Sequence, residues 1–199
     1  MIIYYISRIL KKLKPVSKKN TVIHKTSRVE GGTQIINSSM DKYSFCGYDC
    51  IIENTTIGAF CSIAGNVKIG MASHPFNWVS TSSAFYYGRD SIKKNLARNN
   101  YGLNINTIIG NDVWIAENVL IKAGVKISDG AVIAMGSVLT HDVGAYEIWG
   151  GNPAQFIKKR FDEKTINKLI TSKWWDESDE RLYELSENID NPQAFIKSL

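Results

Sequence analysis

The sequence predicts an all-β protein: a parallel β-helix of six-residue repeats with a protruding loop and C-terminal α-helices. Three observations predict this fold: a six-residue period of apolar residues, one long break in that period, and a helical pattern after the last repeat. An α-helix has a period of about 3.6 and an ordinary strand a period of about 2. A regular period of six therefore indicates short strands separated by corners.

Aliphatic residues carry the period in two blocks: Ile51, Ile57, Ile63 and Ile69, then Ile109, Ile115, Ile121, Ile127, Ile133 and Leu139. Compact side chains stand four residues after these anchors: Thr55, Cys61, Val67, Val113, Val119, Val125, Ala131 and Ser137. A second inward position that accepts only compact side chains fits a narrow coil in which each hexad is one strand and one corner. Three hexads close one turn, so residues 18 apart, such as Ile115 and Ile133, are expected to stack.

One break interrupts the period, because Ile69 and Ile109 are 40 residues apart and 40 is not a multiple of six. An insertion must leave the coil over residues 71–106. A loop this long in a compact domain is usually functional or disordered. Its many aromatic residues argue against disorder, so we expect an ordered loop that serves the function.

The two ends of the chain differ from the repeats. Residues 22–45 are mostly polar and predict an irregular first coil. After residue 160 one helical face is apolar, and a second helix is expected from about Glu180. That apolar face consists of Phe161, Thr165, Ile166, Leu169, Ile170 and Trp174. The chain therefore divides into a basic segment (1–20), a β-helix with its loop (21–160, loop 71–106) and a helical extension (161–199).

The net charge of +5 is local, because residues 1–20 hold six basic residues and no acid, and the rest of the chain sums to −1. A nucleic-acid-binding protein would spread its basic residues over a folded face, so we expect no nucleic-acid partner. Residues 1–6 are apolar, but Arg8 interrupts them well short of a membrane-spanning helix. Two interpretations remain open: the segment lies on an anionic membrane surface, or it caps the open end of the core.

Cys46, Cys50 and Cys61 are odd in number and contain no CxxC pair. This pattern favours reduced thiols that fill small core positions in a cytoplasmic protein.

Two stretches resemble one family: ASHPFNWVST at 72–81 and the run from IIGNDVWIAENV to IKKRF at 108–161. They resemble the hexapeptide-repeat xenobiotic acetyltransferases, which include type B chloramphenicol and streptogramin acetyltransferases and related glycan O-acetyltransferases. The resemblance covers roughly residues 43–175. It implies left-handed coils, acetyl-CoA as co-substrate, and a homotrimer whose active sites lie in clefts between neighbouring subunits. It also implies direct acetyl transfer without an acyl-enzyme.

Acetyl transfer to a hydroxyl needs a base, and histidine is the natural base near neutral pH. His74, in a His-x-x-x-Trp motif where the coil opens into the loop, corresponds to the family's catalytic histidine. His24 and His141 match no active-site position of the family. Three isolated histidines also argue against the zinc-dependent γ-class carbonic anhydrases, which need three imidazoles around one metal. We expect no metal site.

The resemblance and the repeat together suggest where acetyl-CoA binds. Ala116 and Ala134, one 18-residue turn apart, let the pantetheine arm approach the backbone, or they are simply corner residues. Trp114 points outward, as a wall of the cleft or as subunit packing. The other expected contacts are Asn152 and Pro153 at the end of the slot, and Lys158, Lys159 and Arg160 for the CoA phosphates, unless these three form an ordinary solvated patch.

The acceptor is expected to contact the loop and the first coils. The candidates are Tyr43, Tyr48, Trp78, Phe85 and Tyr86. The segment around Tyr43 and Tyr48 is shorter than in the chloramphenicol and streptogramin enzymes, which argues against a drug. The leading hypothesis is O-acetylation of a sugar hydroxyl on a surface glycan or its precursor, in the cytoplasm and at the inner face of the membrane if residues 1–20 bind there. The alternatives are antibiotic inactivation and a non-catalytic scaffold that does not bind acetyl-CoA.

Overall fold

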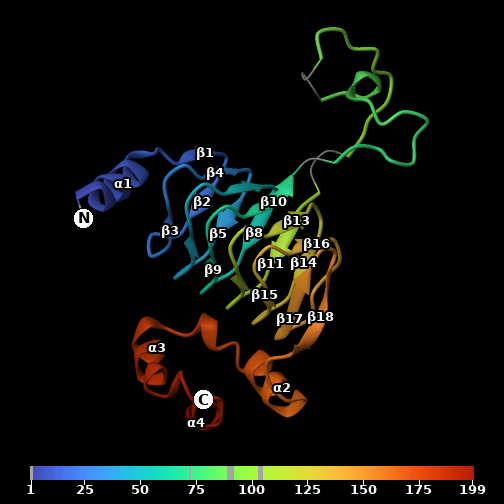
Figure 1. Ribbon diagram of the computed structural model, residues 1–199. Coiled ribbons are helices and arrows are strands. Elements are labelled where there is room, and N and C mark those ends of the chain that lie inside the picture. Colours follow the sequence, from blue (N-terminus) through green and yellow to red (C-terminus); the bar gives the residue numbers. More distant parts are fainter. Residues whose placement is uncertain (1, 72, 89–91, 103–104) are drawn as a thin grey trace.

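The chain winds into a three-sided coil of parallel strands, with helices at both ends (Figure 1). A computed structural model describes residues 2–71, 73–88, 92–102 and 105–199. Face A contains β1 (Ser17–Lys19), β4 (Gln34–Ile36), β7 (Ile51–Glu53), β10 (Lys68–Met71), β13 (Leu120–Lys122) and β16 (Val138–Leu139). Face B contains β2 (Val22–Ile23), β5 (Ser39–Met40), β8 (Thr55–Ile57), β11 (Thr107–Ile109) and β14 (Lys126–Ile127). Face C contains β3 (Arg28–Val29), β6 (Phe45–Cys46), β9 (Ser62–Ile63), β12 (Trp114–Ile115), β15 (Val132–Ile133), β17 (Glu147–Gly151) and β18 (Ala154–Lys159).

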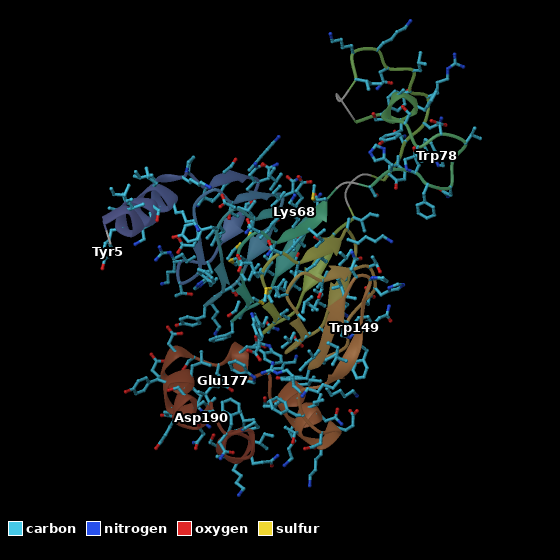
Figure 2. The ribbon with its side chains drawn as sticks, viewed as in Figure 1. Tyr5, Lys68, Trp78, Trp149, Glu177 and Asp190 are labelled. Atoms are coloured by element: carbon cyan, nitrogen blue, oxygen red, sulfur yellow. The ribbon has the colours of Figure 1, made fainter. Side chains whose placement is uncertain are left out.

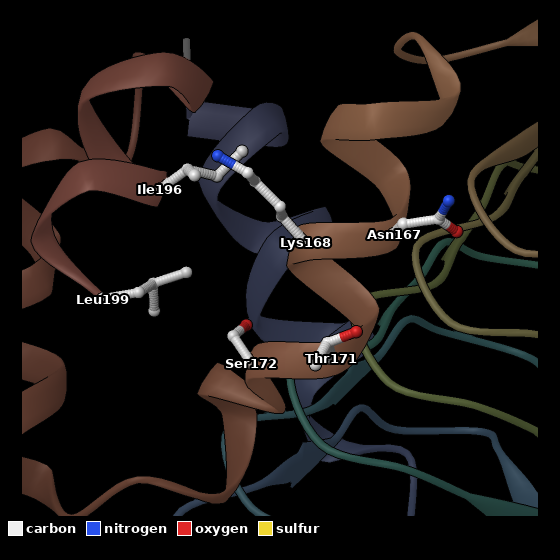
Figure 3. A pocket seen from close by; sticks show the side chains of 6 residues that line it. All are labelled: Asn167, Lys168, Thr171, Ser172, Ile196 and Leu199. Atoms are coloured by element: carbon white, nitrogen blue, oxygen red, sulfur yellow. The ribbon is translucent and has the colours of Figure 1, made fainter.

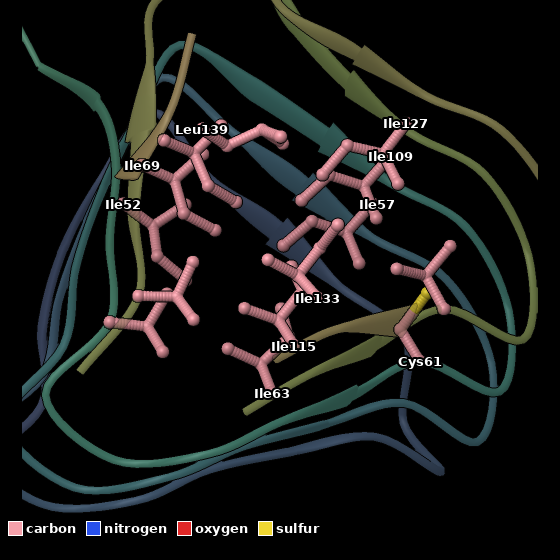
Figure 4. Packing of buried hydrophobic residues seen from close by; sticks show 14 of the residues in the cluster. Ile52, Ile57, Cys61, Ile63, Ile69, Ile109, Ile115, Ile127, Ile133 and Leu139 are labelled. Atoms are coloured by element: carbon pink, nitrogen blue, oxygen red, sulfur yellow. The ribbon is translucent and has the colours of Figure 1, made fainter. Parts of the chain in front are cut away.

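The chain visits the faces in the order A, B, C, and we name its corners AB, BC and CA. Stacked isoleucines fill the interior, one column to a face (Figure 4). On face C, for example, Ile63, Ile115 and Ile133 pair in register, and all three are buried. The compact residues predicted four positions after the anchors are buried too, and so are the three cysteines. The β-helix and its two inward positions are therefore confirmed.

The length of a turn differs between the two blocks. In the turns directly after the loop, equivalent residues are 18 apart, so Ile115 pairs with Ile133 as predicted, and in the last turn they are 16 apart, because Ile133 pairs with Trp149. Before the loop a turn takes 17 residues, because Ile35 pairs with Ile52 and Ile52 with Ile69. The inward residue of β7 is consequently Ile52, which is wholly buried, and the prediction of Ile51 as an anchor is wrong.

An asparagine at the AB corner accounts for the shorter turn. Asn20, Asn37 and Asn54 each have a positive φ near 50°, namely 49°, 49° and 47°. Asparagine tolerates this left-handed conformation better than most residues, and here it turns the chain within fewer residues. The side-chain amides form a ladder, with Nδ2 to Oδ1 distances of 3.1 Å and 3.3 Å. In the later block, Gly124, with a φ of 83°, serves at this corner.

The N-terminal part differs from the prediction in two ways. Residues 22–45 form regular coils, since β2 and β3 pair in parallel with β5 and β6. The coil also begins before residue 21, because β1 pairs with β4. The helix α1 (Ile2–Leu13) leaves its described apolar side chains exposed, while Val16 packs against the core.

The C-terminal extension covers the BC corner (Figure 1). It consists of α2 (Glu163–Ser172), α3 (Asp179–Leu185) and α4 (Pro192–Ser198), with short 3-10 helices at Trp174–Asp176 and Ser186–Asn188. The predicted apolar face of α2 is confirmed: Ile166 and Leu169 pack with Tyr146 and Ala59 of the coil. α4 was not predicted. Within the described residues, no helix has the length and apolar character needed to cross a membrane.

A hollow of about 380 Å³ lies between α2 and α4 (Figure 3). Its lining is Asn167, Lys168, Thr171, Ser172, Ile196 and Leu199. The lining side chains include no histidine, cysteine, aspartate or glutamate, and their polar groups are those of Asn167, Lys168, Thr171 and Ser172.

Candidate active site

The loop leaves face A after Met71 and returns to face B at Thr107, so it is inserted at the AB corner. It extends away from the coil, and Trp78 lies far out on it (Figure 2). The ladder continues beneath the insertion, because β8 pairs with β11 and β10 with β13. The loop is therefore an addition to an uninterrupted coil.

Three aromatic rings form the interior of the loop. The ring centroid of Tyr86 lies 6.1 Å from that of Trp78 and 5.3 Å from that of Tyr101, and Trp78 and Tyr101 are 5.8 Å apart. Tyr86 is wholly buried, so its ring offers no open face to an acceptor, in contrast to what the sequence suggested. Tyr101 was missed by the sequence analysis, because it stands alone in a polar stretch.

The imidazole of His74 is held by this loop interior. Its Nδ1 lies 2.7 Å from the carbonyl oxygen of Thr81 and 3.2 Å from the hydroxyl of Tyr86. A carbonyl oxygen can only accept a hydrogen bond. Nδ1 therefore carries a hydrogen and donates a hydrogen bond to the Thr81 carbonyl. In the neutral ring Nε2 is then unprotonated, and the side chain is exposed. This tautomer suits a base that acts through Nε2.

A second hollow, of about 650 Å³, lies on the loop beside this cluster. Trp78 and Phe85 line it with Asn77, Ser80 and Asn99. The structure thus brings together two of the predicted acceptor residues, Trp78 and Phe85. Aromatic faces beside amide and hydroxyl groups can contact both the apolar face and the hydroxyls of a ring-shaped polar ligand.

The predicted slot for acetyl-CoA lies at the CA corner. Ala116 follows β12 and Ala134 follows β15, and the backbone N–H of Ala134 bonds to the carbonyl of Trp149, 2.8 Å away. The hairpin of β17 and β18 passes close to Ala134, since a Cβ atom added to Gly150 would lie 3.1 Å from the Cβ of Ala134. The hairpin turn holds Asn152 and Pro153, both exposed. Four predicted residues therefore gather at this corner.

Trp114 lies on the outside of face C, between Ser62 and Val132 in register, and is 53% exposed. A large ring this open on a strand is available to a ligand or to another subunit. Its outward direction agrees with the prediction from the repeat.

The three basic residues predicted for the CoA phosphates have different surroundings. Lys158 and Lys159 are exposed on β18, where Lys159 forms an ion pair with Glu163. Arg160 lies at the BC corner, 3.1 Å from the carboxylate of Asp112 and 2.7 Å from the carbonyl of Gly130. Burial raises the pKa of Asp112, and the nearby guanidinium opposes that rise. Arg160 therefore joins the helical extension to the coil.

The two tyrosines of the first coils lie at different corners. Tyr43, at the BC corner, stacks on Phe60 with centroids 5.1 Å apart, and a hydrogen bond to Asp179 raises its pKa. It shares a pocket of about 470 Å³ with Arg160. Tyr48 lies at the CA corner, where the Nζ of Lys11 is 5.8 Å above its ring. The two tyrosines do not form one binding segment within this chain.

The candidate base and the slot do not meet within one chain, because the loop extends away from the coil that carries Ala116 and Ala134 (Figure 1). The loop also exposes apolar residues, with Phe76 87% accessible. As for metal sites, the described residues contain no group of three His, Cys, Asp or Glu side chains placed to hold an ion.

Comparisons with known proteins agree with this architecture. The model of the bacterial transferase hexapeptide family (six repeats) matches residues 106–141. A chloramphenicol acetyltransferase of Klebsiella aerogenes is 40% identical over 134 residues, which cover 66% of this chain and 63% of that protein. The match thus spans less than two thirds of that relative.

A probable macrolide acetyltransferase of Lysinibacillus sphaericus is 40% identical over 139 residues, covering 69% of this chain and 77% of that protein. Among solved structures, a variant of an N-acyltransferase from Bacillus cereus, determined with coenzyme A and an amino sugar nucleotide, has the same fold. Its TM-score is 0.59 at 16% identity, covering 85% of this chain and 96% of that one. The chain belongs to the hexapeptide-repeat xenobiotic acetyltransferase family, which its motifs resemble.

Proposed function

We propose that the protein is an acetyl-CoA-dependent O-acetyltransferase with His74 as general base. The observation that carries this proposal is the hydrogen bond from Nδ1 of the exposed His74 to the Thr81 carbonyl, which leaves Nε2 unprotonated in the neutral ring. A base so placed can remove the proton of an attacking hydroxyl, a step that contributes a factor of about 10²–10⁴ in many enzymes.

The reaction is a direct transfer. Nε2 takes the proton of the acceptor hydroxyl while its oxygen attacks the thioester carbonyl carbon. The carbon–sulfur bond then breaks, and the imidazolium returns the proton to the departing thiolate. The cysteines support a route without an acyl-enzyme: all three are buried in the coil, and burial raises the pKa of Cys61 to about 12.

The active site requires a homotrimer, in which the loop of one subunit meets the CA corner of the next. The separation of His74 from Ala116 and Ala134 supports this arrangement. So does the exposure of Phe76 on a loop that extends away from its own coil (Figure 1). Closed symmetric rings are a common way to complete such a surface.

In this proposal acetyl-CoA occupies the CA corner. Its pantetheine arm lies along Ala116 and Ala134, and Asn152 and Pro153 lie at the end of the slot. Trp114 forms a wall. Lys158 is the first candidate for the phosphates, because Lys159 forms an ion pair with Glu163 and Arg160 is engaged with Asp112. The reaction takes place in the cytoplasm, where CoA thioesters are available.

The acceptor is a sugar hydroxyl, which the aromatic and amide lining of the loop hollow supports. A second candidate is an antibiotic hydroxyl, because relatives at 40% identity are named for chloramphenicol and macrolide acetylation. Tyr43 and Tyr48 contact the acceptor only if another subunit brings it to their corners.

Thiol release from acetyl-CoA, measured against sugars, oligosaccharides, chloramphenicol and macrolides, tests both candidates. Wild type should turn over one class, and His74→Ala should lose about 10²–10⁴-fold in kcat while still binding acetyl-CoA. Turnover of drugs alone would replace the sugar proposal. Wild-type turnover rates in His74→Ala would rule out the base, and absence of acetyl-CoA binding would point to a scaffold.

Subunit mixing tests the shared site. His74→Ala lacks the base, and Ala134→Phe fills the slot, so each should be inactive alone. Co-expressed with two different tags and purified through both, mixed trimers should regain activity, because some sites combine an intact loop with an intact slot. Continued inactivity, with normal assembly and thermal stability of each variant, would contradict a site between subunits.

A further inference from the structure

The helix α1 carries an apolar stripe that the rest of the chain does not cover. Ile3, Ile6, Leu10 and Leu13 recur at helical spacing, with Ile9 beside them, and these five side chains are between 49% and 82% exposed. They belong to neither of the two hydrophobic clusters of the protein. A continuous stripe of this kind indicates a helix that packs against a surface.

Among the described residues, the contacts that fix the helix to the coil lie near its C-terminal end. Nζ of Lys14 lies 2.7 Å from the carboxylate of Asp49, and the Lys11 ammonium lies over Tyr48. From there α1 extends beyond the coil, with Tyr5 near its far end (Figures 1 and 2). A helix of 12 residues is marginal in water by itself. The exposed stripe therefore indicates a partner that stabilises the helix.

The charged residues of the segment that carries the stripe are all basic. Residues 1–20 contain six basic residues and no acid, and Lys12, Lys18 and Lys19 are exposed. Lys11 and Lys12 close the last turn, beside the apolar stripe. A partner that fits both features offers an apolar layer bordered by negative charge.

We propose that α1 lies in the surface of an anionic lipid bilayer, with its stripe at the boundary of the acyl chains and its lysines at the headgroups. The same helix of a second copy fits less well, since it brings the same positive charge. A nucleic acid would leave the stripe in water. This proposal does not depend on His74 or on the nature of the acceptor.

The test is co-sedimentation of the full chain with vesicles of phosphatidylcholine alone or mixed with phosphatidylglycerol, at low and high salt. We expect binding to the anionic vesicles, at least about ten-fold weaker binding to the neutral ones, and weakening by salt. The double variant Ile6→Asp/Leu10→Asp should bind at least about ten-fold less, because it places carboxylates in the stripe. Tyr183→Asp is the matched control, since Tyr183 is 82% exposed on α3.

The lysines are tested separately. Lys12→Glu/Lys18→Glu should lower binding to anionic vesicles, whereas Lys164→Glu/Lys168→Glu on α2 changes the net charge equally and should not. Thermal denaturation and solution turnover should be unchanged in the stripe variant, which separates this proposal from the enzymatic one.

Three results would overturn the proposal. The first is absence of binding by wild type, or equal binding by the stripe variant. The second is a change of oligomeric state in the stripe variant without lipid binding by wild type, which would assign α1 to a contact between copies. The third is RNA binding that survives in the stripe variant while vesicle binding is absent.

Discussion

The coil and the loop inserted into it are held together by different packing. In the coil, each isoleucine stacks on its equivalent one turn away, and parallel ladders join every turn to the next. The loop has a small interior of Trp78, Tyr86 and Tyr101, whose ring centroids lie 5.3–6.1 Å apart. The comparison indicates a division between a repeat that stabilises the fold and a small aromatic cluster that holds the imidazole of His74.

This division has a physical basis. In a repeated stack, each coil buries its apolar residues against the coils on either side, so neighbouring coils stabilise one another. The loop must instead hold one imidazole with few contacts, and it leaves that side chain exposed. Substitutions in the coil should therefore change stability, and substitutions in the loop should change turnover.

The largest effect is expected from a core substitution in the coil. Ile133→Ala removes a wholly buried side chain from the face C column, where it pairs with Ile115 and Trp149, and should cost about 2–5 kcal/mol of unfolding free energy. At a temperature where the variant is folded, its KM for acetyl-CoA should match wild type. Chemical denaturation gives the free energy, with the exposed Val22→Ala as control. A loss below about 1 kcal/mol would mean that the stack relaxes around the cavity.

A smaller effect is expected where the coil meets the helical extension. Arg160→Met leaves Asp112 partly buried without its cation and should cost about 1–3 kcal/mol at neutral pH. Burial already raises the pKa of Asp112, and loss of the guanidinium should raise it further. The ionised carboxylate is then the destabilised form, so the difference from wild type should shrink as acid protonates Asp112. Denaturation at several pH values measures this, and a pH-independent difference would contradict the charge argument.

Within the loop, Tyr86→Phe removes the hydroxyl near Nδ1 of His74 and keeps the ring. The Thr81 carbonyl still accepts from Nδ1, and the Tyr86 oxygen can only share that hydrogen as a second acceptor, so we expect kcat to fall by only about 2–10-fold, at most the size of one hydrogen bond. The KM for acetyl-CoA and the thermal stability should stay unchanged. Steady-state kinetics decide the matter. A stability loss matching that of Ile133→Ala would show that the loop belongs to the main core.

The smallest effect is expected at the 17-residue turns. Asn37→Ala removes the middle amide of the ladder and places alanine at a φ of 49°, so it should cost about 1 kcal/mol. Asn37→Gly also removes the amide, but glycine adopts this positive φ without backbone strain. Comparing the two melting temperatures separates the contributions, and a glycine variant less stable than the alanine variant would mean that φ is not the limiting factor.

The coil was largely predictable from the sequence, because its six-residue period is local and recurs on both sides of the loop, with one residue fewer at the AB corner of the first block. The register of the first block was not, because two adjacent isoleucines, Ile51 and Ile52, could each face inward. The signal that decides between them is Asn20, Asn37 and Asn54, whose spacing of 17 was available in the sequence. Polar corner residues had been interpreted as irregularity.

The candidate site was predictable only in part. The corner residues Ala116 and Ala134 follow directly from the repeat, as does the outward direction of Trp114. The loop has no period, so its sequence does not show that Tyr86 is buried or that Tyr101 joins it. The ion pair of Arg160 with Asp112 depends on how the extension returns to the BC corner. The pattern of residues along the sequence does not show such a long-range contact.

The AB corner, where 17-residue turns give way to 18-residue turns, has a consequence for how such proteins diversify. The ladders on either side of the insertion persist, with one register irregularity between Ile69 and Met71 where β10 enters the loop, so the coil accommodates an insertion at this corner. Loops of other lengths and sequences can therefore replace the present loop at this corner. A different loop at this corner would change the hollow lined by Trp78 and Phe85, while face A and face B would keep their strand pairing.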